Sequence, residues 1–357
     1  MKSKSFMNKP RVCQFSTGFY PGDAITQEML TFDTYFKEMN WKSEIYSEHI
    51  GTAVKSKAIK YSNYKYEKND IIIYHHSINS ALGDFVVQQK AAKILIYHNV
   101  TPYHFFEEYD LQFSYFLRRG KEQLLELNQT FIKSYADSEF NKKELEDYGY
   151  KEVEVLPIAY NFNSLDIPGV NRNKFEGIKI LFVGRITPNK RQEDLIRFAE
   201  IYRKYFRTNF QIQIVGYSSP SSKVYMEELE SLVRFWDLED HIHFSGYVTH
   251  PELIGYYRNS NAFLSMSEHE GFCVPILEAM HFQLPVLAYS AGAIPDTMES
   301  SGILFKEKNY TLIAETLEEV LINEKFKKII LMNQNKRIEN YLKINSGYKI
   351  VEFIQNL

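Results

Sequence analysis

Residues 178–190 read Ile-Lys-Ile-Leu-Phe-Val-Gly-Arg-Ile-Thr-Pro-Asn-Lys. The largely apolar run 178–183 predicts a buried parallel strand that ends at Gly184. Glycine permits a tight turn there, or lets a ligand approach the backbone. Arg185 and Lys190 follow in the same loop and offer a planar guanidinium and a point charge, both suited to phosphate oxygens. The segment therefore predicts a strand followed by an anion-binding loop. The alternative is a solvated strand-end loop.

Similar strands and helices are predicted on both sides of this segment. Downstream, the predicted helices are 192–206 and 223–236, and the predicted strands are 210–215, 242–244, 262–266 and 286–288. Upstream, the predicted strands are 11–16, 70–74, 93–97, 131–136 and 153–156, with a helix over 24–39. Two successive series of this kind predict an α/β protein with two doubly wound, Rossmann-like domains. We expect the domains to face each other across a deep cleft that holds the ligand, because such sheets bind ligands at the carboxyl ends of their strands.

A polar stretch over residues 161–177 separates the two series. It contains Pro168 and Gly169 and is typical of an interdomain linker. We therefore expect a first domain over residues 1–160 and a second domain over residues 161–340. The length of 357 residues fits this division, because domains average roughly 150 residues.

The composition excludes several classes of protein. Hydrophobic residues make up 44% and charged residues 24%, which is ordinary for a globular protein and argues against disorder. A net charge of -3 argues against a nucleic-acid partner. The two cysteines, Cys13 and Cys273, are too few for a disulfide framework and indicate a reducing compartment.

The sequence gives little indication of membrane insertion. Residues 1–10 are polar and no stretch approaches about 18 apolar residues, so we expect a cytoplasmic protein without a transmembrane helix. Residues 103–127 interleave aromatic side chains with Arg118, Arg119 and Lys121. Such a helix could bind peripherally to the inner face of the plasma membrane. The alternative is a core-facing helix with a solvated basic end.

A second segment, residues 267–280, reads Ser-Glu-His-Glu-Gly-Phe-Cys-Val-Pro-Ile-Leu-Glu-Ala-Met. Glu270 and Glu278 flank seven residues, and a helix is predicted to begin near Pro275. Backbone N–H groups at a helix start bind anions and hydroxyls, and each carboxylate can accept hydrogen bonds from sugar hydroxyls or a ribose diol. The alternative is a helix with acidic residues in its first turn, where the helix dipole favours them.

Three segments together resemble a known enzyme family. They are Gly184-Arg185-x-x-Pro188-x-Lys190, then Phe244-Ser245-Gly246-Tyr247-Val248, then the Glu-x7-Glu segment. In this order and at these separations they resemble the retaining family 4 glycosyltransferases, which have the two-domain GT-B fold. The resemblance covers about residues 155–305. It implies an acceptor-binding first domain, a second domain that binds the nucleotide-sugar donor, and a helix over about 341–357 that returns to the first domain.

The resemblance also implies roles for single residues. Arg185 and Lys190 would hold the diphosphate of the donor. Glu270 would be the catalytic-site carboxylate that contacts hydroxyls of the donor sugar, and Glu278 would bind the ribose. The other expected donor-binding positions act largely through their backbone; they are Gly18, Gly22, Val248, Gly271, Phe272, Cys273 and Val274.

The sequence departs from the family pattern at three places. Cys273 stands where the family usually has glycine, so its backbone must suit a side chain. It is either a small, partly buried residue or a thiol nucleophile. The crossing between domains reads Pro157-Ile158-Ala159 without the expected glycine. Gly18 and Gly22 stand apart where the family commonly has a Gly-Gly pair.

Three histidines follow predicted strands of the first domain. His75 and His76 follow the strand over 70–74, and His98 follows the strand over 93–97. The resemblance implies that one of them contacts a distal hydroxyl of the donor sugar and helps to position it. His98 is the first candidate for this catalytic-site role and His76 the second. The alternative is a histidine whose ring bonds to a backbone carbonyl.

The sequence predicts that no metal cofactor is required. It contains no Asp-x-Asp segment and no cluster of cysteines and histidines with metal-ligand spacing. Cationic side chains and helix N-termini would then stabilise the departing diphosphate.

The resulting hypothesis is a retaining, metal-independent glycosyltransferase. It would move a sugar from a UDP-, GDP- or dTDP-linked donor to a hydroxyl of a glycan or lipid-linked acceptor, in cell-surface polysaccharide biosynthesis. A same-face reaction and a double displacement both remain open. The alternative functions are a GT-B phosphorylase, a nucleotide-sugar epimerase and a non-catalytic partner subunit.

Overall fold

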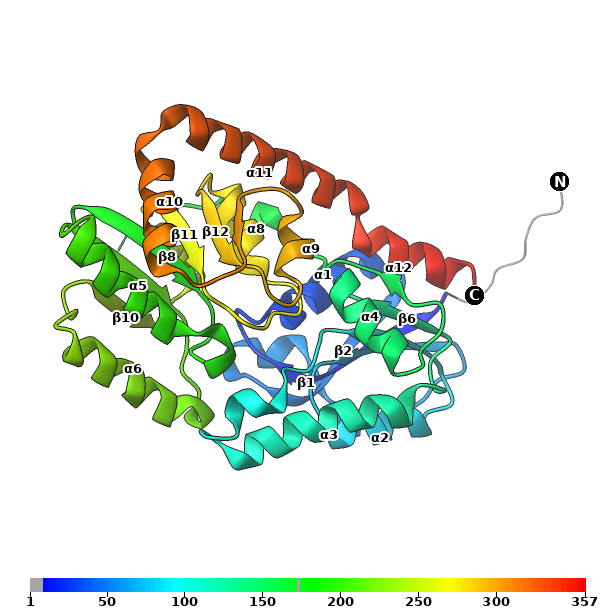
Figure 1. Ribbon diagram of the computed structural model, residues 1–357. Helices are drawn as coiled ribbons and strands as arrows, with labels where there is room; N and C mark the ends of the chain where they lie inside the picture. Colours follow the sequence, from blue (N-terminus) through cyan, green and yellow to red (C-terminus); the bar gives the residue numbers. More distant parts are fainter. Residues whose placement is uncertain (1–8, 172–173) are drawn as a thin grey trace. The chain divides into compact units, whose positions relative to one another are not determined.

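The structure is a computed structural model, and it describes residues 9–171 and 174–357 (Figure 1). The chain divides into two compact units. Unit 1 comprises the residues up to Val100, Phe116–Asn161 and Ile344–Leu357. Unit 2 comprises Thr101–Tyr115 and Phe162–Lys343.

Unit 1 is built on a parallel sheet of seven strands in the order β3-β2-β1-β4-β5-β6-β7. The strands are β1 (Arg11–Phe19), β2 (Lys42–Ile50), β3 (Ile59–Lys60), β4 (Asp70–His76), β5 (Ala92–Tyr97), β6 (Lys133–Ala136) and β7 (Glu154–Val155). The helices are α1 (Ala24–Glu38), α2 (Ala81–Gln88), α4 (Glu139–Asp147) and α12 (Ser346–Gln355), and α3 (Leu111–Leu127) enters from unit 2. The strand order reverses between β1 and β4, which marks the topological switch point of this sheet.

Unit 2 repeats this topology with six parallel strands in the order β10-β9-β8-β11-β12-β13. The strands are β8 (Ile178–Val183), β9 (Phe210–Val215), β10 (Ile242–Gly246), β11 (Ala262–Ser265), β12 (Val286–Tyr289) and β13 (Ile303–Phe305). The helices are α5 (Gln192–Tyr205), α6 (Lys223–Phe235), α7 (His250–Arg258), α8 (Val274–His281), α9 (Ile294–Met298), α10 (Tyr310–Ile322) and α11 (Glu324–Ile344). The switch point of this sheet lies between β8 and β11.

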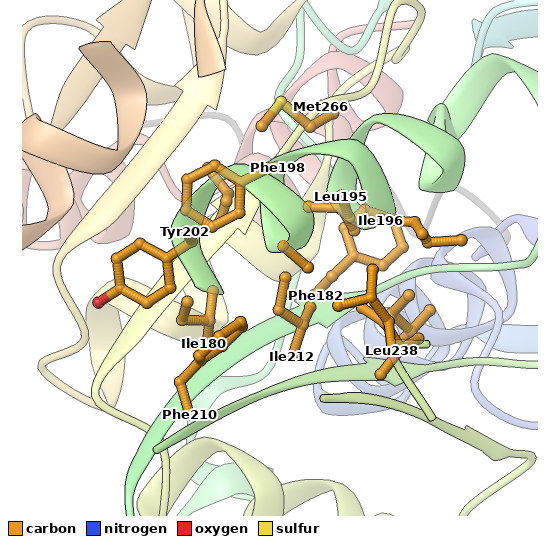
Figure 2. Close-up of a cluster of buried hydrophobic side chains, with 14 of the residues drawn as sticks. Ile180, Phe182, Leu195, Ile196, Phe198, Tyr202, Phe210, Ile212, Leu238 and Met266 are labelled. Carbon is orange, nitrogen blue, oxygen red and sulfur yellow. The ribbon is translucent and has the colours of Figure 1, made fainter. Parts of the chain in front are cut away.

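The core of unit 2 lies between its sheet and α5 (Figure 2). The apolar residues of α5 recur at helical spacing, so Leu195, Phe198 and Tyr202 fall on the face that meets the sheet. Phe182 of β8 and Ile212 of β9 meet them from below. The sheet that carries the predicted donor loops is therefore held by a continuous apolar layer.

The core of unit 1 includes the C-terminal helix. Ile350 and Val351 of α12 are buried in the same cluster as Phe32 of α1, and Tyr348 packs edge-on against Tyr35. The C-terminal residues 344–357 thus belong to unit 1, α12 begins at Ser346, and residues up to Lys343 belong to unit 2.

Several predicted elements are present with shifted ends. β1 continues beyond the predicted Ser16 to Phe19, because Gly18 pairs with His49 of β2. β4 continues to His76 because His75 pairs with Ser16 and Ile96. β2 was not predicted, because its polar residues break any continuous apolar run.

The domain division differs from the prediction in one segment. Thr101–Tyr115 belongs to unit 2, where the hydroxyl of Tyr109 donates to Glu228 and its ring packs on Tyr225. The first part of the predicted linker also belongs to unit 2, since the N–H of Val170 donates to the carbonyl of Pro251 at 2.8 Å. The polar N-terminus over residues 1–8 and positions 172–173 of the predicted linker lie outside the described residues.

Candidate functional site

The two loops predicted to bind a donor follow neighbouring strands of the sheet in unit 2. β8 and β11 pair in parallel, with Ala262 opposite Ile180. The loops after these strands, residues 184–190 and 266–273, therefore start at the same edge of the sheet. Because this is the switch point, it is the place where open α/β sheets bind their ligands.

The turn after β8 depends on a glycine of the neighbouring strand. Gly216 directly follows β9 and lies against this turn. A Cβ added at Gly216 would stand 1.8 Å from the carbonyl oxygen of Gly184. The N–H of Gly184 donates to the carbonyl of Val215 at 2.9 Å. Arg185 follows with an exposed side chain, and no residue in the described part of the chain forms an ion pair with it. The turn thus presents an unpaired cation at the switch point.

Lys190 and Glu270 are in direct contact. The distance from Nζ of Lys190 to Oε1 of Glu270 is 2.5 Å, and the two side chains are 16% and 8% exposed. Lys190 ends the short 3₁₀ turn Pro188–Lys190, after which Arg191 has a left-handed backbone with φ of 54°. Lys190, which is predicted to bind the diphosphate, and Glu270, which is predicted to bind the sugar, therefore form an ion pair with each other.

Two hydrogen bonds join the two loops. The side-chain amide of Asn189 donates to the carbonyl of His269 at 3.0 Å, and the N–H of Glu268 donates to the carbonyl of Asn189 at 2.9 Å. On the other side, Gly292 lies so close to Glu270 that a Cβ would stand 2.6 Å from its carbonyl oxygen. Sequence reasoning missed Asn189 and Gly292; for Gly292 the available signal was a glycine shortly after a predicted strand.

Cys273 adopts the backbone conformation of the glycine that it replaces. It precedes α8 with φ of 74°, in the left-handed region where a Cβ is unfavourable. Burial, and then the carboxylate of Glu270, raise the pKa of the Cys273 thiol well above its usual value. The thiol is therefore protonated at neutral pH, which argues against the nucleophile alternative.

The other predicted donor positions lie around these loops. Gly271 and Phe272 lead into α8, and Val274 is its first residue. Glu278 lies in α8 with a buried side chain, and its Oε2 accepts from the hydroxyl of Tyr257 at 2.6 Å. Val248 follows the end of β10, next to Tyr247, whose side chain is 62% exposed. Contacts with ribose and base stay predictions.

A charged cluster behind the donor loops was also missed from the sequence. Nζ of Lys308 lies 2.6 Å from both Asp194 and Glu268, and Nε of Arg191 lies 3.3 Å from the same two carboxylates. Asp194 is buried at the start of α5. Burial alone would raise its pKa, but the hydrogen bond from Lys308 and the charge of Lys308 hold the pKa below the usual aspartate range. The cluster anchors the loop that carries Glu270.

The predicted glycines of unit 1 occupy different settings. Gly18 lies inside β1, against the ring of Tyr20. Gly22 lies in the turn before α1, next to Asp23, whose carboxylate caps that helix by accepting from the N–H of Thr26 at 3.0 Å. Their predicted contact with a diphosphate stays a prediction.

The ring nitrogens of His98 are both hydrogen-bonded within unit 1. Nδ1 lies 2.9 Å from Oδ2 of Asp137, and Nε2 lies 2.9 Å from Nδ1 of His75. His98 is 9% exposed, and His76, the second candidate, is fully buried. The predicted contact of His98 with a donor sugar stays a prediction, and it would require one of these two hydrogen bonds to open.

Electrostatics in this region are set by burial and by neighbouring carboxylates. Burial alone would lower the pKa of His98, but Asp137 and then Glu28 raise it to about 9. Burial raises the pKa of the Glu28 carboxyl. Burial also lowers the pKa of His76 to about 3, so that this ring stays neutral. Glu28, His75 and His98 form a group with metal-ligand spacing that sequence reasoning missed, because nothing in the sequence marks Glu28.

One protein-family model matches the part of the chain that holds the two loops predicted to bind a donor. Residues 166–341 match the family model described as glycosyl transferases group 1. This part of the chain, just under half of its length, is similar to the glycosyl transferases group 1 family. The resemblance predicted from Arg185, Lys190, Glu270 and Glu278 is confirmed at this level, whereas the family 4 subtype stays a prediction.

Curated relatives match slightly less than half of the chain. The O-antigen biosynthesis glycosyltransferase WbnH of Escherichia coli is 30% identical over 164 residues, which are 46% of this chain and 43% of WbnH. The capsular polysaccharide biosynthesis glycosyltransferase CapM of Staphylococcus aureus is 26% identical over 162 residues, which are 44% of this chain and 40% of CapM. The chain therefore matches less than half the length of these relatives.

Solved structures are similar over nearly the whole chain. Anabaena HepE, in complex with UDP and glucose, aligns with a TM-score of 0.76 and 14% identity over 98% of this chain and 100% of HepE. Sucrose-phosphate synthase from Thermosynechococcus elongatus aligns with a TM-score of 0.76 and 15% identity over 98% and 99% of the two chains. At such identities the likeness shows the fold. The predicted α/β class with two Rossmann-like domains of the GT-B type is confirmed.

Among the described residues, no helix combines the length and the apolar character needed to cross a membrane.

Proposed function

We propose that the chain is a glycosyltransferase that moves a sugar from a nucleotide-sugar donor to a hydroxyl of a glycan or lipid-linked acceptor. The observation that carries this proposal is the switch point of unit 2, where exposed Arg185 lies in the same loop as the Lys190–Glu270 ion pair. The family match over residues 166–341 supports the same conclusion.

Donor binding would replace the ion pair between Lys190 and Glu270 with an ion pair between Lys190 and the diphosphate. The diphosphate of the donor brings two negative charges, and Arg185 and Lys190 supply two positive ones. Phosphate oxygens would compete with Glu270 for the ammonium group of Lys190. The released carboxylate would then accept hydrogen bonds from hydroxyls of the donor sugar, while Glu278 binds the ribose.

The same cations would stabilise the leaving group. As the C1–O bond of the donor sugar loosens, negative charge develops on the departing diphosphate next to Arg185 and Lys190. We expect this arrangement to act without a metal ion at the diphosphate. We also expect retention at C1 through a same-face reaction in which the leaving phosphate takes the acceptor's proton, since the Cys273 thiol is protonated and Glu270 is assigned to hydroxyl binding.

Two similarities suggest which donor and which acceptor to test first. HepE was solved with UDP and with UDP-glucose, which makes UDP the first nucleotide to test. WbnH and CapM are O-antigen and capsule enzymes, so a cell-surface polysaccharide is the proposed product. The reaction would then take place in the cytoplasm, where nucleotide sugars are made, with the protein free or held peripherally at the membrane.

Thermal unfolding with UDP, GDP, ADP, dTDP and their sugar conjugates tests this function. A ligand at about 100 times its dissociation constant adds roughly 2.7 kcal/mol of stability. We expect UDP or its conjugates to raise the unfolding temperature of the wild type and of Arg234→Ala, an exposed arginine on α6, but not of Arg185→Ala. The absence of a shift with every nucleotide, or an unchanged shift in Arg185→Ala, would contradict the proposed site.

A further inference from the structure

His98 belongs to a buried chain of hydrogen bonds at the switch point of the sheet in unit 1. It directly follows β5, and its side chain is 2% exposed. Nδ1 of His98 lies 2.9 Å from Oδ2 of Asp137, and Nε2 lies 2.9 Å from Nδ1 of His75. The two imidazole rings are nearly coplanar, at 9°, so the facing nitrogens point at each other. Both nitrogens of His98 are therefore hydrogen-bonded, and their partners show where the protons lie.

Gln14 fixes the proton of His75. The amide nitrogen of Gln14 donates to the carbonyl of Met29 at 2.9 Å, so its amide oxygen faces His75. This oxygen lies 3.2 Å from Nε2 of His75 and accepts a hydrogen bond from the N–H there. Burial lowers the pKa of His75 well below its usual value, so this ring carries one proton and is neutral. Nδ1 of His75 therefore has a lone pair.

Both partners of His98 are then acceptors. The lone pair on Nδ1 of His75 requires a proton on Nε2 of His98, and the carboxylate of Asp137 requires a proton on Nδ1. An imidazole that donates from both nitrogens is an imidazolium cation. The order of donors and acceptors from Gln14 to Asp137 therefore places a positive charge on His98.

Carboxylates from two parts of unit 1 stabilise this charge. Asp137 follows β6, and Oε2 of Glu28 on α1 lies 3.5 Å from Nε2 of His98. Asp23, the N-cap of α1, also favours the charged ring. His76 of β4 is buried, and its pKa of about 3 keeps it neutral, so it adds no competing positive charge. Burial alone would lower the pKa of His98, but the carboxylates raise it to about 9.

We propose that His98 acts as an imidazolium in sugar transfer. Gln14 and His75 on one side of the ring, and Asp137 on the other, are the positioning residues that keep both nitrogens protonated. The inference rests on the proposed function, in which the resemblance implies that His98 contacts a hydroxyl of the donor sugar. That hydroxyl would replace Nδ1 of His75 as the acceptor, while Asp137 holds the ring. A charged N–H forms a shorter and stronger hydrogen bond than a neutral one.

A neutral His98 beside a protonated Asp137 is the competing arrangement. Burial raises the pKa of Asp137, and the proton on Nδ1 would then move to the carboxylate. This keeps the hydrogen bond but removes the positive charge beside Glu28, whose buried Oε2 has no hydrogen-bond donor among the described residues. A buried carboxylate without a compensating partner is unfavourable, which favours the imidazolium.

Nuclear magnetic resonance of the full, untagged chain labelled with ¹⁵N-histidine tests the charge. At about pH 8 a histidine with the ordinary pKa of about 6.5 is neutral. The two ring nitrogens of a neutral imidazole differ widely in chemical shift, whereas those of an imidazolium are nearly equal. At this pH we expect an imidazolium signal in the wild type and in His49→Gln, an exposed histidine of β2, but not in His98→Gln. The signal should titrate with a pKa of about 9.

Asp137→Asn and Gln14→Met test the positioning residues. Loss of the Asp137 carboxylate should lower the pKa of His98 by about 1–3 units. In Gln14→Met, His75 is free to move its proton to Nδ1 and donate to His98, which should also lower the pKa of His98. For transfer from the nucleotide sugar with the largest thermal shift, kcat should fall above about pH 9 in the wild type. In Asp137→Asn it should fall at a lower pH, with the thermal shift by UDP unchanged.

Three results would overturn the inference. They are the absence of an imidazolium signal in the wild type at about pH 8, an unchanged pKa of His98 in a folded Asp137→Asn, and coincident pH profiles of kcat for the wild type and this variant. Failure of the proposed function would appear separately, as the absence of a thermal shift with every nucleotide. If Asp137→Asn does not fold, the wild-type signal and its titration decide alone.

Discussion

The two units have the same strand order around their switch points but use them differently. In unit 2 the switch point is lined by charged loops, with Arg185 exposed and Lys190 partly exposed beside Glu270. In unit 1 the corresponding position is filled by Glu28, His75 and His98, which are buried and contact one another. One topology can thus support either an open binding site or a closed polar cluster, and the side chains at the strand ends decide which of them forms.

The largest effect is expected for Lys190→Ala. This variant removes one of the two cations at the proposed leaving diphosphate, and loss of a single transition-state contact of this kind costs about 10²- to 10³-fold in rate. Sugar transfer from the preferred donor should fall by that factor. Lys223→Ala, an exposed lysine on α6, should transfer at the wild-type rate. Equal rates for the two variants would show that the unit 2 switch point is not the donor site.

The next largest effect is expected on stability, when a glycine near one of the switch points is replaced by alanine. In Gly216→Ala the new Cβ would stand 1.8 Å from the backbone oxygen of Gly184, so the turn must move, at a cost of about 3 kcal/mol. In Gly18→Ala the Cβ would meet the ring of Tyr20 at 3.0 Å, and this ring can turn aside at a cost of about 0.5 kcal/mol. Urea unfolding measures both. Equal losses would mean that the turn after β8 is more compliant than the structure indicates.

Lys308→Met should have an intermediate effect that depends on pH. Buried Asp194 loses a charged hydrogen bond, which costs about 2 kcal/mol of stability at pH 7. Because Lys308 holds the pKa of Asp194 below its usual range, the stabilisation is present above about pH 4 and is lost as the pH falls further. The midpoint of acid unfolding should therefore move to higher pH in Lys308→Met but not in Lys306→Met, an exposed neighbour. Coincident acid-unfolding curves for these two variants would exclude the anchoring role.

Glu28→Gln tests whether the switch point of unit 1 affects UDP binding at the switch point of unit 2. It is expected to bind UDP within about twofold of the wild type, because Arg185, Lys190 and Glu278, the proposed side-chain ligands of the nucleotide, belong to unit 2. Isothermal titration calorimetry with UDP measures this directly. A loss of UDP affinity in folded Glu28→Gln would mean that the buried cluster contributes to donor binding.

The smallest effect is expected for Cys273→Gly. Glycine relieves the left-handed backbone, a gain of about 1 kcal/mol, but it also loses the buried thiol and increases the entropy of the unfolded chain. The net change in stability should stay within about 1 kcal/mol, and transfer should continue. Abolished transfer in a folded Cys273→Gly would restore the thiol nucleophile that its raised pKa argues against.

The two units also differ in how far the sequence predicts them. In unit 2 the predicted site residues lie in two short segments, so Gly184, Arg185, Lys190 and Glu270 could be picked out from the sequence, although their roles stay predictions. The direct contact of Lys190 with Glu270 could not be predicted, because it depends on how the loops after β8 and β11 pack. Lys308 and Gly292 were missed because their roles arise from tertiary contacts.

In unit 1 the sequence predicts most of the strands but not the buried cluster of Glu28, His75 and His98. β4 and β5 are continuous apolar runs, and the histidines that end them are visible in the sequence. Glu28 looks like an ordinary helix residue, because helical periodicity alone does not indicate that a carboxylate faces the core. The polar strand β2 was missed for a related reason, since pairing with β1 and β3 holds it in the sheet without an apolar run.

Hydrogen–deuterium exchange of the wild type with and without UDP tests the central claim most directly. The account predicts slower exchange at residues 184–190 and 266–278 when UDP is bound, with little change at the ends of β4 and β5 in unit 1. Protection confined to unit 1, or no protection at the two donor loops under saturating UDP, would contradict the claim that the unit 2 switch point holds the donor.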